Sequence, residues 1–247
     1  MIVLGIDIGG SATKGALVDT LTGELVSERV RRKSSDSKSP KDIVSDIIKI
    51  AKELNYSGII GAGFPGPVKK GVITTAVNMH QAWVGVDLAK MISDASGHPA
   101  YVLNDADAAG MGEMRFGAPE AREVNVALFL TLGTGLGTAL FVEGHLVPNT
   151  ELGHMLVGEK SAETYSTASV KRKENLTYKQ WAVRLNHSLS VYEFLLSPDL
   201  IILGGGISAQ FEKYEKYFTI KTKVIPARLQ NLAGIIGAAV SAKEKLS

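Results

Sequence analysis

The chain has 247 residues, of which 45% are hydrophobic and 21% charged, and its formal net charge is only +2. This composition is ordinary for a soluble globular protein, and so small a charge argues against a field that attracts nucleic acid or membranes. The absence of cysteine excludes disulfides, thiol catalysis and a cysteine-based zinc site. Residues 1–7 are too short an apolar run for a signal peptide, and no stretch approaches the roughly 18 apolar residues of a membrane span. We therefore expect a cytoplasmic protein without a membrane or nucleic-acid partner.

The first half of the chain alternates predicted strands and helices, which indicates an α/β fold. Three strands separated by turns at Gly9-Gly10 and Thr22-Gly23 predict an antiparallel meander. A later strand ends directly before Asn104. The expected strands are 2–6, 15–18, 24–30, 59–63 and 100–103, and the expected helices are 42–54 and 86–95.

The second half of the chain repeats the pattern of the first. A strand, a glycine turn at 133–137 and two more strands follow one another, and Ala139-Leu140 takes the place of Ala16-Leu17. We interpret this as an internal duplication of a strand–glycine turn–strand unit; the alternative is chance similarity of two β-hairpins. The expected strands are 125–130, 138–142, 145–147 and 200–203, and the expected helices are 176–196 and 234–246.

Two glycine-rich turns, at 7–14 and 132–137, could each hold a phosphate group, because glycine lets backbone N–H groups approach an anion closely. Neither turn ends in the Gly-Lys-Ser/Thr of a Walker loop, and a strand rather than a helix follows the second, which argues against a dinucleotide fingerprint. A tight hairpin is the alternative for each turn. Asp7, at a strand end, could hold a hydrated magnesium ion or could be a structural cap. Lys14 is a further candidate.

Asn104 and Asp105 come directly after a predicted strand. Phosphoryl transfer to an alcohol needs a cradle for the phosphates, a metal and a carboxylate that takes the hydroxyl proton. Asp105 can take that proton, and Asn104 can orient the substrate through a second hydroxyl. The alternative is an N-cap on a helix that begins near Ala106. Asp107 fits the role of cap or first-turn residue better.

Glu151 and His154 place a carboxylate and an imidazole three residues apart. They could form a metal pair, although no third ligand is evident nearby; they could recognise sugar hydroxyls; or they could be a surface glutamate and a structural histidine. Glu163 could join them. The basic run at 171–173 could meet a long polyanion or could be a solvated helix face.

Taken together, these segments resemble the ROK family (repressors, open reading frames, kinases) over nearly the whole chain. The resemblance implies the actin-like, ribonuclease-H-like ATPase fold, with two lobes from an internal duplication. Within the family the chain is most similar to bacterial enzymes that phosphorylate the 6-hydroxyl of glucose with inorganic polyphosphate, and ATP is a second donor. The stretches that carry the resemblance are 5–11, 64–66, 103–110, 113–117, 130–135 and 147–154.

The resemblance also implies roles for individual residues. Asp105 matches the catalytic base, and Asp7 would hold Mg²⁺ through water. The implied substrate-binding residues are Asn78, Asn104, Asp105, Glu151, His154 and Glu163. The implied donor-binding residues are Asp7, Gly9, Gly10, Ser11, Lys14, Thr131, Gly133, Thr134 and Gly135, together with Gly204, Gly205 and Gly206, which match a turn near the adenosine of a bound nucleotide.

Two departures from the family pattern matter. Many ROK proteins carry a cysteine-rich zinc motif after the Gly-His pair; this chain has no cysteine, so we expect no zinc, and His154 is left for sugar contact or structure. Family repressors carry an N-terminal helix-turn-helix, for which there is no room before Ile2. We expect an N-terminal lobe at 1–104, with the helix at about 234–247 packing back onto it, and a C-terminal lobe at 105–233.

Several alternatives remain open at this point. The protein could be a strictly ATP-dependent hexokinase that acts on glucose or mannose. It could instead be a non-catalytic sugar sensor or DNA-binding repressor, against which the missing helix-turn-helix and the presence of Asp105 count. A cytoskeletal filament protein is a third alternative, for which the chain is short. Because relatives are commonly dimers, we expect a homodimer.

Overall fold

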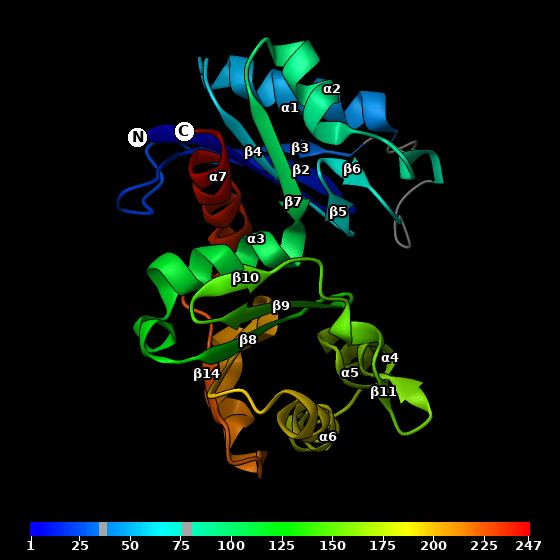
Figure 1. The fold of residues 1–247 in the computed structure, drawn as a ribbon. Helices are drawn as coiled ribbons and strands as arrows, with labels where there is room; N and C mark the ends of the chain where they lie inside the picture. Colours follow the sequence, from blue (N-terminus) through cyan, green and yellow to red (C-terminus); the bar gives the residue numbers. More distant parts are fainter. Residues whose placement is uncertain (35–38, 76–80) are drawn as a thin grey trace. The chain divides into compact units, whose positions relative to one another are not determined.

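The computed structural model describes residues 1–34, 39–75 and 81–247, which fold as two compact units (Figure 1). Unit 1 consists of Met1–Phe116 and Leu232–Ser247, and unit 2 consists of Gly117–Asn231. The division falls after Phe116 rather than after residue 104, because the helix that begins at Asp105 packs against the last helix of the chain.

Unit 1 contains a five-stranded sheet in the order β3-β2-β1-β4-β7, in which β1, β4 and β7 are parallel and β2 and β3 are antiparallel. Its elements are β1 (Ile2–Ile8), β2 (Ala12–Asp19), β3 (Val30–Lys33), α1 (Pro40–Glu53), β4 (Ile60–Phe64), β5 (Val68–Lys69), β6 (Val72–Ile73), α2 (Leu88–Ser96), β7 (Ala100–Asn104), α3 (Asp105–Gly112) and α7 (Ala233–Leu246), with a 3₁₀ turn at Gln81–Trp83 and a π-helical turn that begins at Glu113.

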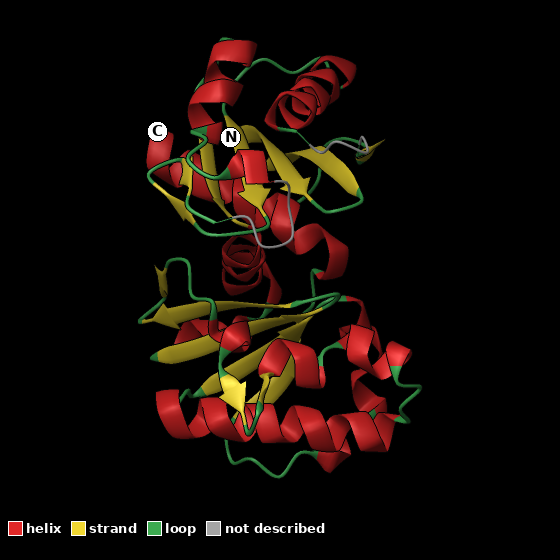
Figure 2. Cartoon of the chain, turned by 90° about the vertical axis from the view of Figure 1, so that its right-hand side faces the viewer, coloured by secondary structure: helices red, strands yellow, loops and turns green. Residues whose placement is uncertain are grey.

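The two faces of this sheet are covered by different helices, as Figure 2 shows. Leu4, Ile6 and Ile8 alternate along β1 and join one buried cluster with residues of α1 and α2. On the other face the approach of α7 is so close that a Cβ on Gly5 would lie 2.1 Å from Ile235 O, and one on Gly61 would lie 2.0 Å from Ala238 O. Glycine at these two positions is therefore what allows α7 to lie on β1 and β4.

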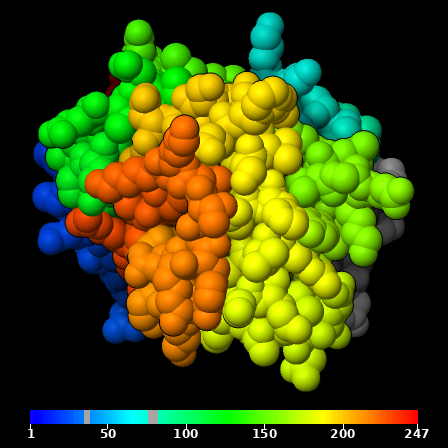
Figure 3. All heavy atoms as spheres, turned by 90° about the horizontal axis from the view of Figure 1, so that it is seen from below, coloured from blue at the N-terminus to red at the C-terminus, as the bar shows by residue number. Residues whose placement is uncertain are grey.

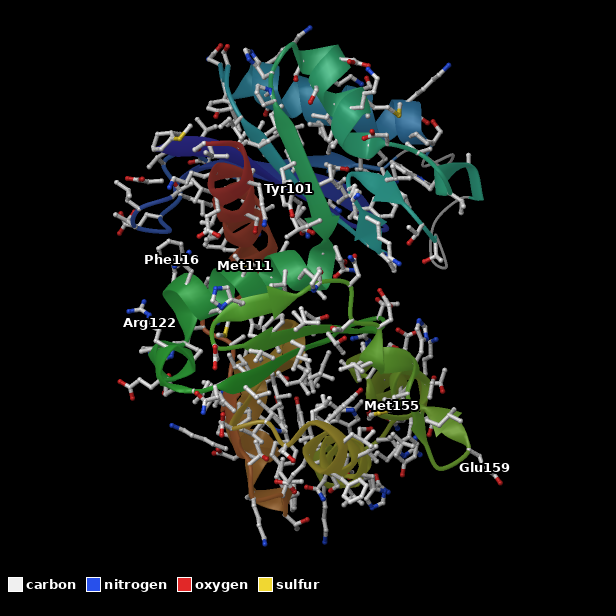
Figure 4. All side chains as sticks on the ribbon, in the orientation of Figure 1. Tyr101, Met111, Phe116, Arg122, Met155 and Glu159 are labelled. Atoms are coloured by element: carbon white, nitrogen blue, oxygen red, sulfur yellow. The ribbon has the colours of Figure 1, made fainter. Side chains whose placement is uncertain are left out.

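Helix α3 packs on α7 through equally small residues. A Cβ on Gly237 would lie only 1.7 Å from Ala108 O, and one on Gly112 would lie 2.5 Å from Ala233 O. Met111 of α3 and Tyr101 of β7 mark this part of unit 1 in Figure 4. This contact between distant parts of the sequence is why α3 belongs to unit 1.

The expected third strand at 24–30 is wrong in its position. Only an isolated bridge joins Leu25 to Val18, and β3 begins at Val30. The reason is that the Ser27 hydroxyl accepts the hydrogen bond of Leu17 N, at 2.9 Å, where a strand would offer a carbonyl. The antiparallel meander is otherwise confirmed.

Unit 2 contains a five-stranded sheet in the order β10-β9-β8-β13-β14, with β8, β13 and β14 parallel. Its strands and helices are β8 (Val126–Leu132), β9 (Leu136–Val142), β10 (His145–Val147), β11 (Leu156–Val157), β12 (Lys160–Ser161), α4 (Ala162–Ser166), α5 (Ala168–Lys173), α6 (Tyr178–Leu196), β13 (Leu200–Gly204) and β14 (Lys223–Pro226). Its 3₁₀ segments are Pro119–Glu123, Leu152–His154, Gly206–Lys213 (η5), Glu215–Tyr217 (η6) and Gln230–Leu232. The last of these ends at Leu232, the first residue of the second segment of unit 1.

The core of unit 2 lies between its sheet and α6. Leu128, Leu130 and Leu132 alternate along β8 and pack with Trp181 of α6 and Tyr214, all of them buried. Helix α6 and the segment from η5 to η6 lie side by side, as the yellow and orange atoms of Figure 3 show. Trp83 of unit 1 is likewise fully buried, so both tryptophans are core residues.

The two sheets share one topology, three antiparallel strands followed by two parallel ones. The expected duplication predicts this agreement, whereas chance similarity of two hairpins does not account for the position of the parallel strands. No helix among the described residues is both long and apolar enough to cross a bilayer.

Candidate active site

The first glycine turn joins β1 to β2, and Asp7 lies beside it. Asp7 pairs across the sheet with Lys14 of β2, and Lys14 Nζ lies 3.1 Å from Asp7 Oδ2, with both side chains partly exposed. A Cβ on Gly234 would lie 3.7 Å from Asp7 Cγ, so the first turn of α7 also approaches this carboxylate. Asp7 therefore combines a cationic neighbour with access to solvent.

The backbone of this turn is open on its outer side. Gly9 closes the turn by donating its N–H to Ala12 O at 3.0 Å. A Cβ on Gly10 would meet no atom within 4 Å, and both Gly10 and Ser11 are exposed. An anion could therefore approach the backbone at Gly10 and Ser11 without displacing protein atoms.

Asn104 is the N-cap of α3. Its Oδ1 accepts hydrogen bonds from Ala106 N at 2.9 Å and from Asp107 N at 3.0 Å, and the side chain is buried. The cap is thus Asn104, and Asp107 lies in the first turn. Because the carbonyl oxygen is engaged, the amide nitrogen of Asn104 is the group that could donate to a substrate hydroxyl.

Asp105 is the first residue of α3 and is half-buried. The register of the parallel strands aligns Asp7 with Gly63, and Gly63 with Leu103. Two strand spacings of about 4.8 Å each separate β1 from β7, so Asp7 and Asp105 lie at the same edge of the sheet, about 10 Å apart across it. This edge is formed by the carboxyl ends of the parallel strands, where open α/β sheets bind their ligands.

The second glycine turn, Gly133–Gly135, joins β8 to β9 in unit 2. Gly133 N donates to Gly135 O at 3.0 Å. Ser169, in the first turn of α5, holds the turn from outside, because its N–H donates to Gly133 O and its hydroxyl donates to Thr134 O. Thr131 contributes its hydroxyl as the acceptor for Gly137 N. The shape of the turn is therefore held by side chains that its glycine pattern does not reveal.

Glu163 of α4 lies directly over this turn. Its Oε2 accepts the hydrogen bond of Leu136 N at 3.0 Å, and a Cβ on Gly135 would lie 2.5 Å from the same oxygen. Glycine at 135 is therefore required for the carboxylate to reach Leu136. The expected sugar-contacting residue is thus also a neighbour of the expected donor turn.

The turn Gly204–Gly206 ends β13, the strand beside β8. A Cβ on Gly205, whose φ is +84°, would lie 2.6 Å from Leu132 O, so this turn abuts the end of β8. Ser208 caps the turn by donating both its N–H and its hydroxyl to Gly205 O. The structure therefore brings together the two glycine turns of unit 2.

Glu151 and His154 lie on a loop that is anchored to β9. A Cβ on Gly153 would lie 2.1 Å from Leu136 O. Only glycine at position 153 therefore lets this loop come so close to the backbone of Leu136. The buried Thr138 hydroxyl donates to Thr150 O at 2.6 Å and accepts from Leu152 N at 3.2 Å. These contacts fix the loop beside the second glycine turn.

The charges of this loop are coupled. Partial burial raises the pKa of the Glu151 carboxyl above its usual value; His154 opposes this shift, and the nearby Glu163 carboxylate adds to it. Glu151 Oε2 lies 3.7 Å from His154 Nε2, and both side chains remain accessible. Glu151, His154 and Glu163 therefore form one polar group in unit 2.

The candidate residues thus fall into one set in each unit, and Asn78 lies outside the described residues. Unit 1 carries Asp7, Gly9, Gly10, Ser11, Lys14, Asn104 and Asp105; unit 2 carries Thr131, Gly133, Thr134, Gly135, Glu151, His154, Glu163, Gly204, Gly205 and Gly206. No group of three or more potential metal ligands occurs within the described part of the chain. The sequence patterns did not reveal Thr138, Gly153, Ser169 or Gly234, since no local spacing marks such contacts.

Known proteins resemble this chain over most of its length. The ROK family model matches residues 3–168. The polyphosphate glucokinase of Mycobacterium tuberculosis (strain CDC 1551 / Oshkosh) is 40% identical over 238 residues, which are 96% of this chain and 89% of that protein. The polyphosphate glucokinase of Mycobacterium leprae (strain TN) is 38% identical over 238 residues, 96% of this chain and 73% of that protein.

Solved structures extend the likeness to three dimensions. The inorganic polyphosphate/ATP-glucomannokinase from Arthrobacter sp. strain KM matches with a TM-score of 0.93 and 37% identity over 99% of both chains. A ROK family glucokinase from Streptomyces griseus, solved with glucose and AMPPNP, matches with a TM-score of 0.84 and 22% identity, over 99% of this chain and all of that one. Both have the actin-like ATPase fold, which is therefore the fold of this chain.

Proposed function

This chain belongs to the ROK family, and we propose that it phosphorylates the 6-hydroxyl of glucose with inorganic polyphosphate, or with ATP, as the donor. The relatives named polyphosphate glucokinases, about 40% identical over nearly the whole chain, support this choice of substrates. The observation that carries the proposal is the position of Asp105, which begins α3 at the same sheet edge as Asp7 and the first glycine turn.

Asp105 acts as the general base in this proposal. The 6-hydroxyl oxygen of glucose attacks the terminal phosphorus of the donor, its proton passes to the Asp105 carboxylate, and the bond between that phosphorus and the bridging oxygen breaks. Positioned general bases contribute about 10²- to 10⁴-fold to turnover. The Asn104 amide, fixed by its cap, orients the sugar through a neighbouring hydroxyl.

Asp7 suits a divalent metal of the magnesium type. Mg²⁺ keeps several waters and commonly takes only one or two protein carboxylates along with substrate phosphates, so a single accessible Asp7 fits without a cluster of ligands. When bound, the ion neutralises charge on the transferring phosphoryl group. Lys14, paired with Asp7, adds a second positive charge for the donor phosphates.

The other residues bind the two substrates. The backbone N–H groups of the glycine turns at Gly10–Ser11 and Thr134–Gly135 hold donor phosphates, and Gly204–Gly206 lies beside the second of these turns. Glu151 and Glu163 accept hydrogen bonds from sugar hydroxyls, and His154 completes that group.

The test is an Asp105→Asn variant, which removes the base with little change in shape. We expect turnover of glucose to fall about 10²- to 10⁴-fold, while calorimetric glucose binding stays within a few-fold. Asp94→Asn is the matched control, because Asp94 is an exposed helical residue paired with Lys90. Near-normal turnover in the Asp105 variant would remove this residue from its proposed role.

Two further assays define the reaction and the assembly. Purified protein is given glucose with either polyphosphate or ATP; turnover with ATP alone would rule out polyphosphate as a donor and leave a strictly ATP-dependent hexokinase. We also propose that the protein is a homodimer, and light scattering during size-exclusion chromatography measures its mass directly.

A further inference from the structure

Two lysines from different segments of unit 2 converge on one aromatic ring. Lys171 Nζ lies 4.2 Å from the centroid of the Tyr178 ring, and Lys213 Nζ lies 5.6 Å from the same centroid. Within the described residues, neither ammonium group has a carboxylate partner within 4.0 Å, and Glu174, which follows the basic run at 171–173, is paired with Arg184. The Glu212 and Glu215 carboxylates lie near the adjacent Tyr214, but neither forms an ion pair with Lys171 or Lys213, so the two lysine charges still favour the binding of an anion.

The ring that gathers these lysines is itself fixed. Tyr178 is the first residue of α6. It directly follows the N-cap Thr177, which forms a capping box with Gln180. Its hydroxyl donates to Gln210 Oε1, and its ring stacks on that of the buried Tyr214 with centroids 6.3 Å apart. The ring that both ammonium groups contact is therefore rigid, whereas the lysine stems remain flexible.

These two lysines are connected to both glycine turns of unit 2. Lys171 lies in the same short helix, α5, as Ser169, which bonds the backbone of the second glycine turn; the two side chains, two residues apart, point to different sides of that helix. Lys213 ends η5, the segment that begins at Gly206 directly after the turn that abuts Leu132. Both lysines are thus carried by segments that form the proposed donor site.

We propose that Lys171 and Lys213, positioned by Tyr178, bind the distal phosphates of a long polyphosphate chain whose terminal phosphate lies at the Gly133–Gly135 turn. This rests on the proposed function. Polyphosphate carries charge on every unit and no base or sugar, so point charges that rotate freely, such as lysine ammonium groups, suit it. Exposed Arg172 and Lys173 extend the same positive surface.

The proposal predicts a dependence on donor length. A long chain reaches both the turn and the lysines, whereas tripolyphosphate binds at the turn and is too short to reach the lysines as well. In the wild-type protein the KM for long-chain polyphosphate is therefore lower than that for tripolyphosphate. In the double variant Lys171→Gln/Lys213→Gln we expect this advantage to fall at least tenfold. For the long chain, the slope of log KM against log salt concentration should also decrease by about 1.4 in this variant, at about 0.7 for each lost phosphate contact.

Lys216→Gln is the matched control, because Lys216 Nζ also lies over an aromatic ring, that of Tyr217 at 5.4 Å, but belongs to η6 and not to η5, which begins in the Gly204–Gly206 turn. Unfolding midpoints of all variants verify the fold. Direct binding of long-chain polyphosphate, measured by calorimetry, accompanies the kinetics.

The outcomes separate the two ideas. If wild-type protein uses polyphosphate and the double variant keeps the full advantage of long chains, the lysine site is refuted and the proposed function stands. If wild-type protein binds long chains without turning them over, and the double variant loses that binding, the site stands and the donor assignment is wrong. Absence of both binding and turnover in the wild-type protein overturns both.

Discussion

The contact between Gly135 and Glu163 makes a sharp prediction for the variant Gly135→Ala. The added Cβ would lie 2.5 Å from Glu163 Oε2, and ordinary contacts begin at 3.4 Å. The carboxylate must therefore move by about 0.9 Å. That movement displaces the carboxylate from the position in which it accepts the 3.0 Å hydrogen bond of Leu136 N.

The size of the effect follows from the bond that is lost. Hydrogen bonds to charged groups contribute about 1.5–3 kcal/mol, and each 1.4 kcal/mol corresponds to a factor of ten. If the bond holds the second glycine turn in the shape that binds the donor, kcat/KM for the donor falls about ten- to a hundredfold in Gly135→Ala. The alanine itself is otherwise tolerated, because the backbone at Gly135 does not have a positive φ.

The assay is a double-mutant cycle with steady-state kinetics. Glu163→Ala alone removes the same bond, and adding Gly135→Ala to it then costs little further activity, because the clashing oxygen is gone. Gly133→Ala is the control in the same turn, since its Cβ would meet no atom within 4 Å; its effect should add to that of Glu163→Ala. Full donor kcat/KM in Gly135→Ala, or additive effects of Gly135→Ala and Glu163→Ala, would refute the reasoning.

Two other predictions concern stability and pH. Gly237→Ala places a Cβ 1.7 Å from Ala108 O, so urea unfolding should show a loss of stability near the upper end of overpacking costs, about 3 kcal/mol. Gly234→Ala, whose Cβ would meet no atom closer than 3.7 Å, should lose far less; equal losses would contradict the packing argument. The raised pKa of Glu151 means that its folded form binds its proton more tightly than the unfolded chain does, so this group's contribution to stability falls as pH rises from the ordinary glutamate pKa through the raised one. Over the same window the ionised Glu151 becomes a better acceptor for sugar hydroxyls, so KM for glucose should fall; a Glu151→Gln variant should lack this dependence, and a variant that retains it would place the titrating group elsewhere.

The sequence was informative wherever a local pattern decides the structure. The apolar runs at 2–6, 59–63 and 200–203 coincide with β1, β4 and β13 to within two residues, because short apolar runs flanked by glycine are typical of buried strands. The glycine turns were likewise visible, since glycine at a strand end has few other uses. The position of Asp105 directly after a strand was predicted as well, since β7 ends at Asn104.

What the sequence did not reveal depends on contacts between distant residues. The division after Phe116 follows from the fit of Gly112 against Ala233, which no local signal announces. The position of Glu163 over Gly135 is a contact of the same kind, and it places a proposed sugar-binding residue against the proposed donor turn. The expected N-cap exists, but Asn104 forms it, one residue before the helix begins at Asp105, and Asp107 lies in the first turn.

The place of α7 has a consequence for the order in which the protein is made. Unit 2 is one continuous segment, whereas unit 1 needs residues from both ends of the chain. Synthesis of the whole of unit 2 therefore precedes synthesis of the helix that covers one face of the unit 1 sheet. Until that helix is in place, the glycine-lined face of β1 and β4 lacks the partner on which its packing depends.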